Sequence, residues 1–296
     1  MKYLDTKQIL RIFWHPHQKL WNYVLVKEVE KIFPIPCINY RLIQIIIVLD
    51  TFIFFFRILF RRFYTLGIKN FLSKKSLPEN ITILYFDIGT HKAGKELTLM
   101  VESILPKLGK KFVAYGFDAS QESYVQVRKK FDKKKNVWIF KRAFCNCNTV
   151  DGKIKLYHHD DGLGDSVYRK GTSFEEVKSS KFSDWLLENE VILCDKICLI
   201  RMNIEGAEYD VLKDLVECGL YKYIDGYFGM WDDLSKIDRQ RDKAFRNFLL
   251  KHKIYPITFN GRDLGFSLRI KCIQYEVETC IQSGLRNMAR LKKLPF

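Results

Sequence analysis

The sequence predicts an α/β fold with a mostly parallel β-sheet, and three observations support this prediction. Apolar segments of strand length alternate with segments of helix length from Ile81 onward, which is typical of βαβ units. Two of the apolar segments end in Asp87 and Asn203, each followed closely by a glycine, as at the ligand-binding ends of such strands. The 296-residue chain is 47% hydrophobic, which is enough for a substantial core.

The order of the elements follows from the apolar periodicity along the chain. The expected strands are Ile81–Asp87, Phe112–Asp118, Val137–Arg142, Lys153–His158, Ile197–Asn203 and Tyr223–Trp231. The expected helices are Gly94–Leu105, Gln121–Lys133, Phe182–Glu188, Ala207–Cys218 and Leu234–Lys253. A polar loop is expected at His158–Gly171. Two late strands without a helix between them, Ile254–Phe259 and Phe266–Tyr275, predict an antiparallel hairpin at the end of the sheet.

The charge of the chain predicts an N-terminal region that is distinct from the main domain. The net charge is +16, and residues 1–80 contain 13 Lys/Arg and 5 Asp/Glu, which gives +8 for that part alone. So basic a chain fits an anionic partner. Nucleic acid is not the expected one, because half of the charge precedes the predicted main domain. We expect a basic aromatic region at 1–76, a main domain at 77–280 and a basic tail at 281–296.

The segment 42–60 is the most apolar part of the N-terminal region. Fifteen of its nineteen residues are apolar, close to the ~20 residues that span a bilayer. A charge at the centre of a spanning helix, here Asp50, costs roughly 2.5–3.5 kcal/mol. Three interpretations stay open: a helix in the membrane interface, a helix packed on the protein body, and a transmembrane anchor. With eight cysteines, no C-x-x-C pair and no secretory signal, we expect a cytoplasmic protein, at the cytoplasmic face of a membrane if this segment contacts lipid.

The first candidate site is the turn after the first expected strand. Its pattern is Asp87-x-Gly89-x-His91-x-x-Gly94. Glycine lets the backbone approach a ligand where a Cβ atom would clash, and a strand, a glycine turn and a helix form a nucleotide-binding corner in an open sheet. The acid favours a ligand with a positive charge. The structural alternative is a strand end with a helix-capping turn.

The second and third candidate sites lie at two other expected strand ends. Asp118 ends the second strand, where an acid accepts hydrogen bonds from ribose hydroxyls, although it could instead cap the next helix. Asn203, Glu205 and Glu208 surround the end of the strand Ile197–Asn203. Ligands bind at the carboxyl ends of strands in such sheets, whereas acids are also favoured in the first turn of a helix. At each position a ligand contact and a helix cap remain open.

These segments together resemble the FkbM-type family of S-adenosylmethionine-dependent methyltransferases over roughly residues 81–232. The segments that carry the resemblance are Phe86-Asp87-Ile88-Gly89-Thr90-His91, Gly116-Phe117-Asp118-Ala119-Ser120 and Asn203-Ile204-Glu205-Gly206-Ala207-Glu208. The resemblance implies a Rossmann-like class I methyltransferase fold with a seven-stranded, mostly parallel sheet. It also implies S-adenosylmethionine as the cofactor, and O-methylation of a glycan, glycolipid or related hydroxyl.

The cofactor contacts follow from the same resemblance. They are expected at Asp87, Gly89, Thr90, His91, Gly94, Asp118, Ala119, Asn203 and Glu205. Thr90-His91 stands where the family has Ala-Asn, and Asn203 stands where it has Asp. These departures keep a second hypothesis open, a non-catalytic member of the family that binds a cofactor or a partner and is anchored at a membrane.

The catalytic base and the acceptor contacts are expected near the same strand ends. The candidate bases are His158, His159 and His91, because a histidine accepts a hydroxyl proton near neutral pH. The candidate substrate contacts are Asp165, Ser166, Glu208, Trp231 and Asp232. A solvated loop and a core tryptophan are the alternatives. The histidines and aspartates of the loop could also hold a divalent metal ion, but we expect no metal site.

Overall fold

The structure is a computed structural model, and it describes residues 81–108, 111–145, 151–159, 164–231, 234–258 and 266–291. The chain divides into two units, and the unit formed by Leu77–Phe259 and Ile273–Phe296 contains all of the described residues except Phe266–Cys272. The apolar segment 42–60 and the predicted boundary at residue 76 lie outside the described residues.

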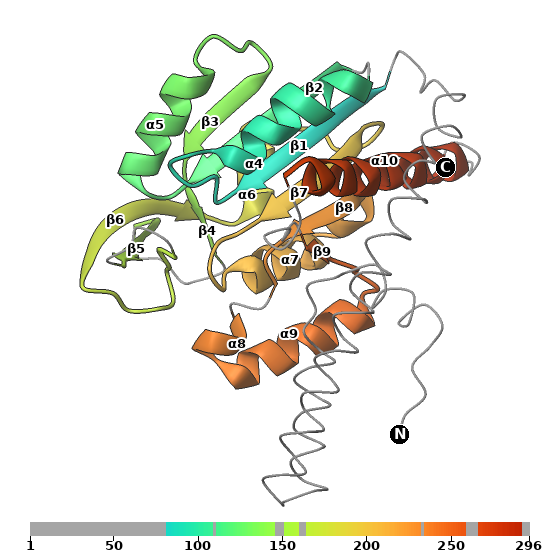
Figure 1. The fold of residues 1–296 in the computed structure, drawn as a ribbon. Helices are drawn as coiled ribbons and strands as arrows, with labels where there is room; N and C mark the ends of the chain where they lie inside the picture. The colour runs from blue at the N-terminus through green and yellow to red at the C-terminus, as the bar shows by residue number, and fades with distance from the viewer. Residues whose placement is uncertain are drawn as a thin grey trace, which may run out of the picture. The chain divides into compact units, whose positions relative to one another are not determined.

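The described residues form a central sheet of six parallel strands in the order β3-β2-β1-β7-β8-β9 (Figure 1). The strands are β1 (Thr82–Ile88), β2 (Lys111–Asp118), β3 (Val137–Lys141), β7 (Ile197–Met202), β8 (Ile224–Gly229) and β9 (Ile257–Thr258). The expected α/β class with a mostly parallel sheet is thus confirmed. From β1, the strands β2 and β3 follow on one side of the sheet, whereas β7, β8 and β9 follow on the other side. The strand order therefore reverses between β1 and β7.

Helices cover both faces of this sheet. One face carries α4 (Lys95–Thr98), its π-helical continuation Leu99–Ile104, α5 (Gln121–Phe131) and the part of α10 (Phe266–Leu291) from Ile273 onward. The other face carries α6 (Phe182–Glu188), α7 (Glu208–Glu217), α8 (Leu234–Ile237) and α9 (Arg239–Lys251). Short 3₁₀ turns lie at Pro106–Leu108 and Leu220–Tyr223.

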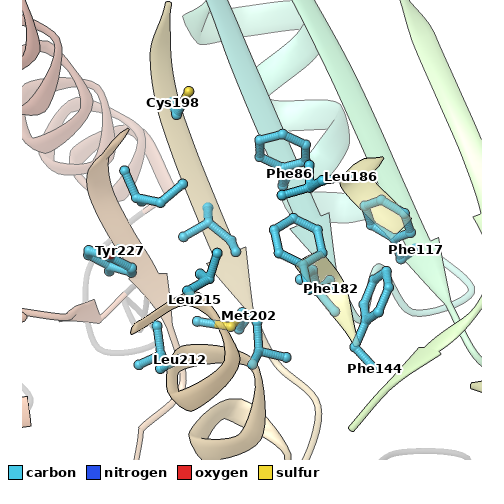
Figure 2. Packing of buried hydrophobic residues seen from close by; sticks show 14 of the residues in the cluster. Phe86, Phe117, Phe144, Phe182, Leu186, Cys198, Met202, Leu212, Leu215 and Tyr227 are labelled. Carbon is cyan, nitrogen blue, oxygen red and sulfur yellow. The ribbon is translucent and has the colours of Figure 1, made fainter. Parts of the chain in front are cut away.

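The alternation of side chains along β1 divides the core in two. Ile83 and Tyr85 pack toward α4 and α5, whereas Leu84, Phe86 and Ile88 pack toward α6 and α7. Successive side chains of a strand point to opposite faces, so a strand buried on both faces is apolar throughout. The second core is largely aromatic. Figure 2 shows Phe86, Phe117, Phe144 and Phe182 gathered on one side, with Leu212 and Leu215 of α7 around Met202.

A second, smaller sheet is inserted between β3 and α6. Its order is β4-β6-β5, formed by Ala143–Phe144, Ser173–Ser180 and Lys153–His158. β5 and β6 are antiparallel, with Leu156 opposite Glu175, and β4 is parallel to β6. β5 coincides with the expected extended segment. The sequence analysis did not predict β6, because only Val177 and Ser179 of that strand are buried and its apolar alternation is therefore weak.

Three predicted elements differ from the structure. The predicted strand Phe266–Tyr275 is wrong, because these residues belong to the helix α10, and the expected terminal hairpin is not formed. The predicted strand Ile254–Phe259 shrinks to the two residues of β9. The predicted helix Leu234–Lys253 is broken at Asp238, whose carboxylate accepts hydrogen bonds from Gln240 N and Arg241 N and so begins α9.

No helix among the described ranges is both long and apolar enough to cross a membrane.

Candidate functional site

A cavity opens at the carboxyl ends of β1, β2 and β7, where the strand order reverses. Open α/β sheets bind ligands at such a switch point, because the loops on either side of it diverge. The lining residues come from the turns after these strands, from the end of β3 and from the inserted sheet. They are Ile88, Gly89, His91, Phe117, Asp118, Ala119, Ser120, Ser123, Arg142, Ala143, Leu156, Gly164, Asp165, Val167, Asn203, Ile204, Glu205 and Ala207.

Gly89 shapes the floor of the cavity because the chain after β1 passes close to the end of β7. A Cβ atom at Gly89 would lie 2.1 Å from the carbonyl oxygen of Asn203, and the residue has φ +85°. Only glycine combines such a close approach with a left-handed backbone at low cost. The Gly89 N–H donates to the Phe117 carbonyl at 2.8 Å. The turn is therefore fixed against both β2 and β7.

Asp118 ends β2 and faces the cavity with a carboxylate that already accepts backbone hydrogen bonds. The His91 N–H donates to Oδ2 at 2.7 Å, and the Ser120 N–H donates to Oδ1 at 3.0 Å. The Thr90 hydroxyl donates to Oδ2 at 3.4 Å. Burial nevertheless raises the pKa of Asp118 to about 6, against the effect of these bonds. Its carboxylate is thus held rigidly between the β1 turn and α5 and titrates near neutral pH.

The turn Asn203–Glu208 carries a second acid into the cavity on a strained backbone. Glu205 has φ +50°, which is uncommon for a residue with a side chain and costs of order 1 kcal/mol or more. The Glu208 carboxylate holds the turn, because it accepts from Ile204 N and from Gly206 N, each at 2.8 Å. Glu208 is therefore a buried residue that stabilises the turn, and the acid of this turn that lines the cavity is Glu205.

The loop after β5 brings Asp165 to the cavity because its next residues are bonded to α7 and α9. The Ser166 hydroxyl donates to the Glu205 carbonyl at 2.9 Å. The Tyr168 hydroxyl bonds to the Asp210 carboxylate, and the Arg241 guanidinium, 4.1 Å from the Tyr168 ring centre, donates to the same carboxylate at 2.5 Å. These contacts fix Asp165 beside the Glu205 turn.

The charges that line the cavity are mostly negative. Asp118, Asp165 and Glu205 contribute carboxylates, and Arg142 contributes a guanidinium that lies 3.6 Å from the Glu188 carboxylate. Carboxylates on the walls of a cleft favour a cationic ligand. No group of three or more histidine, cysteine or acidic side chains suited to a metal ion occurs among the described residues. The arrangement therefore fits an organic cation better than an anion.

Two buried polar atoms of cavity-lining residues have no hydrogen-bond partner among the described residues. They are His91 Nε2 and Asn203 Oδ1. The Ala93 N–H points to His91 Nδ1 at 3.5 Å, which favours the tautomer with the proton on Nε2. His91 then has an unpaired donor and Asn203 an unpaired acceptor, both buried in residues that line the cavity. Buried polar groups are nearly always paired, so these two atoms indicate where a polar ligand would bond.

Asp87 lies outside the cavity, although it belongs to the same motif. Because side chains alternate along β1, Asp87 is on the face of Tyr85 and is completely buried. The Arg201 guanidinium donates to its Oδ1 at 2.7 Å and to the Gly89 carbonyl at 2.7 Å. Burial raises the pKa of Asp87 to about 6, and the Arg201 charge opposes the shift. The pair supports the Gly89 turn from behind.

The other predicted site residues divide between the cavity and its surroundings. Gly89, His91, Asp118, Ala119, Asp165, Asn203 and Glu205 line it, whereas Thr90, Gly94, His158, His159, Ser166, Glu208 and Trp231 do not. Asp232 lies outside the described residues. His158 Nδ1 is 2.8 Å from Asp165 Oδ2, and the Arg169 side chain donates to His159 Nε2 at 3.0 Å. The Trp231 indole donates to the Ile257 carbonyl at 3.3 Å.

The sequence analysis missed Arg142 and the apolar wall formed by Leu156 and Val167. Arg142 directly follows β3, so its place at a strand end was the available signal. Leu156 and Val167 lie on the inserted sheet and its loop, whose position over the main sheet is not encoded by any local pattern.

A comparison with models of protein families gives no match for this chain, and a search of curated proteins gives none.

Proposed function

We propose that this protein is an S-adenosylmethionine-dependent O-methyltransferase that acts on a glycan, glycolipid or related hydroxyl. The observation that carries the proposal is the position of Asp118, a partly buried carboxylate at the end of β2 that lines the cavity beside the switch point of the sheet. An acid at this place is suited to the two ribose hydroxyls of a nucleoside. The seven-stranded sheet of such enzymes remains part of the proposal, because the described residues supply six strands.

The lining of the cavity fits the rest of the cofactor. Three carboxylates against one paired guanidinium suit a sulfonium cation. The donor at His91 Nε2 and the acceptor at Asn203 Oδ1 suit the carboxylate and ammonium groups of the methionine end. Gly89 lines the cavity, and its close approach to the Asn203 backbone brings the turn after β1 and the turn after β7 together at this end of the ligand. When bound, S-adenosylmethionine supplies an activated methyl group.

The residues of the chain then have to position a hydroxyl and accept its proton. Asp165 presents a carboxylate to the cavity, and His158 lies behind it at 2.8 Å, itself 3.6 Å from Glu175. We assign proton acceptance to the Asp165–His158 pair. Most of the rate would come from holding the hydroxyl in line with the methyl group.

Calorimetry with S-adenosylmethionine tests the cofactor assignment. We expect the wild type to bind, and Asp118→Ala to weaken binding roughly 100-fold or more, because it removes two hydrogen bonds to a charged group that contribute about 1.5–3 kcal/mol each. Asp132→Ala, at the exposed end of α5, is the matched control and should bind like the wild type. NADP⁺ should give no heat of binding, because the carboxylates that line the cavity would repel its negatively charged phosphates. If the wild type showed no binding of S-adenosylmethionine, or if Asp118→Ala bound it equally well, the cofactor assignment would be overturned.

A second candidate is a non-catalytic protein that binds the cofactor or a partner at a membrane. The position of His158 and His159 outside the cavity favours it, since no predicted base of that loop faces the ligand directly. Transfer of radioactive methyl groups to a panel of glycan acceptors separates the two candidates. Turnover with any acceptor removes the binding-only function, whereas cofactor binding without turnover across the panel supports it.

A further inference from the structure

Several lysines lie at the amino ends of β2 and β3. The cavity lies at the carboxyl ends of the strands, so these lysines are at the opposite end of the sheet. Lys111 begins β2, and residues 133–135 lie in the turn that ends one residue before β3. The two groups are neighbours, because Ala114 pairs with Val137 and the Asn136 side chain donates to the Phe112 carbonyl at 3.4 Å. Lys107 lies in the turn before β2. We call Lys107, Lys111, Lys133, Lys134 and Lys135 the basic edge.

The basic edge carries a net positive charge that is available to a partner. Lys107, Lys111, Lys133 and Lys135 are exposed, and Lys134 lies 3.3 Å from the Glu102 carboxylate. Glu102 and the exposed Asp132 are acidic residues close to these lysines in the sequence. Exposed charges that are spread over several short turns attract an extended anionic surface more than a single small ion.

Two further described elements have an end at the basic edge or at the same ends of the strands. Thr82, the first residue of β1, pairs with Lys111. In the sequence, β1 follows residues 1–80, which carry a net charge of +8 from 13 Lys/Arg and 5 Asp/Glu. At the other end, Gly284 of α10 packs on Asp225 at the start of β8, and the last turns of the helix, which carry Arg286 and Arg290, follow beyond it.

Two exposed aromatic residues lie near the same ends of the strands. Trp138, the second residue of β3, is 55% exposed, and Tyr223, directly before β8, is 38% exposed. Tryptophan and tyrosine are enriched where a protein meets the headgroup level of a bilayer. An exposed aromatic residue beside lysines therefore fits a lipid interface.

From these observations we propose that the basic edge docks on an anionic lipid surface, with the cavity directed away from the lipid. A nucleic acid fits less well. One bound at the basic edge would lie at the opposite end of the strands from the cavity, and one that entered the cavity would meet Asp118, Asp165 and Glu205. The inference does not depend on methyl transfer, because it rests on the opposite end of the sheet.

Co-sedimentation of the full chain with vesicles tests the proposal. The wild type should bind vesicles of phosphatidylcholine with 30% phosphatidylserine and bind pure phosphatidylcholine much less, a probe composition taken from the charge of natural anionic leaflets. The triple variant Lys107→Gln, Lys133→Gln, Lys135→Gln should bind the anionic vesicles roughly 100-fold less, since each lysine near such a surface contributes about a fivefold factor. Binding should also weaken as salt is raised.

A matched triple variant separates the basic edge from the general charge of the chain. Lys153→Gln, Lys155→Gln and Lys178→Gln remove three exposed lysines from the inserted sheet and change the net charge equally. This control should bind like the wild type. Equal losses in the two triples, or no preference of the wild type for anionic vesicles, would overturn the proposal.

Competition with duplex nucleic acid completes the test. At a fixed salt concentration near 0.15 M, a 20-base-pair DNA should not displace the wild type from anionic vesicles. Displacement by DNA, together with lost DNA binding in the basic-edge triple, would assign the edge to nucleic acid instead. Because these assays contain no S-adenosylmethionine, they can fail while the cofactor titration succeeds, and the reverse.

Discussion

The two ends of the strands carry opposite charge and hold it in different ways. At the carboxyl ends, Asp118 is partly buried and accepts hydrogen bonds from His91 N and Ser120 N, and desolvation raises its pKa to about 6. At the amino ends, Lys133 and Lys135 are exposed to solvent. The acids at the carboxyl ends are held around a cavity, whereas the lysines at the amino ends are exposed on the surface.

This difference separates a site that works by position from a surface that works by total charge. A buried carboxylate must be supported by specific donors, since an unsupported one destabilises the fold. An exposed lysine contributes little to folding and acts at a distance of about a Debye length, ~8–10 Å in physiological salt. Substitutions at the two ends should therefore differ in kind as well as in size.

The largest expected effect is at Arg201, which pairs with Asp87 below the cavity. We expect Arg201→Met to lower the free energy of unfolding by about 3–5 kcal/mol, because it leaves a buried carboxylate without its counter-charge. Urea denaturation at pH 7 measures the change. The matched variant at the amino ends, Lys111→Met, should stay within about 0.5 kcal/mol of the wild type.

The double variant Asp87→Leu with Arg201→Met sharpens this comparison. Removing both members of a buried pair should restore part of the stability that the single change loses, because no unpaired charge remains. If Arg201→Met were no more destabilising than Lys111→Met, the proposed difference in stability between the buried ion pair and the exposed lysines would be wrong.

The next effect concerns the close approach at Gly89. Gly89→Ala places a Cβ atom 2.1 Å from the Asn203 carbonyl oxygen, whereas Gly219→Ala, also at positive φ, meets no atom within 4 Å. We expect Gly89→Ala to be less stable than Gly219→Ala by about 1–3 kcal/mol, the usual cost of overpacking. It should also lose S-adenosylmethionine binding, measured by calorimetry. Equal stability of the two variants would show that the turn has room to move.

A smaller effect is expected from pH, through Asp118. Its pKa is raised from the ordinary value of 3.8 to about 6, so the carboxylate that accepts hydrogen bonds is lost as pH falls through 6. We expect the dissociation constant for S-adenosylmethionine to be constant above pH 7 and to rise about tenfold at pH 5. Because Asp165 also lines the cavity, Asp118→Ala is measured in parallel and should have the flatter profile. A wild-type constant that does not change between pH 7 and pH 5 would contradict this role.

Sequence patterns predicted the sheet and its strand ends better than they predicted the side-chain directions. The apolar runs of β1 and β7 are buried on both faces and that of β2 is partly buried, so their positions are evident from composition alone. Asp87 and Asp118 both end such runs, but only Asp118 reaches the cavity. Asp87 lies on the other face of β1 because side chains alternate along the strand, and its partner there, Arg201, is 114 positions away, a pairing that no local pattern contains.

The helix α10 shows a second limit. Phe266–Tyr275 alternates apolar and polar residues for a few positions and so favours a strand locally. Over the longer range, Ile273, Val277, Cys280 and Ile281 recur at helical spacing, and these four side chains are buried against the sheet. The longer apolar stripe determines the structure, because it buries more surface than a short strand would at the edge of the sheet.

The smallest expected effect returns to the basic edge. Lys107→Gln, Lys133→Gln and Lys135→Gln together should change the free energy of unfolding by less than about 0.5 kcal/mol at 0.15 M salt, because surface substitutions away from specific contacts have little effect. At low salt the triple variant should become slightly more stable, since mutual repulsion among the lysines is removed and is screened less. Urea denaturation at both salt concentrations measures this. A loss of more than about 1 kcal/mol would mean that these lysines hold the turns before β2 and β3. Weaker vesicle binding by the triple would then report an altered fold, and the contrast between the two ends of the sheet would have to be re-established with Lys111→Gln alone.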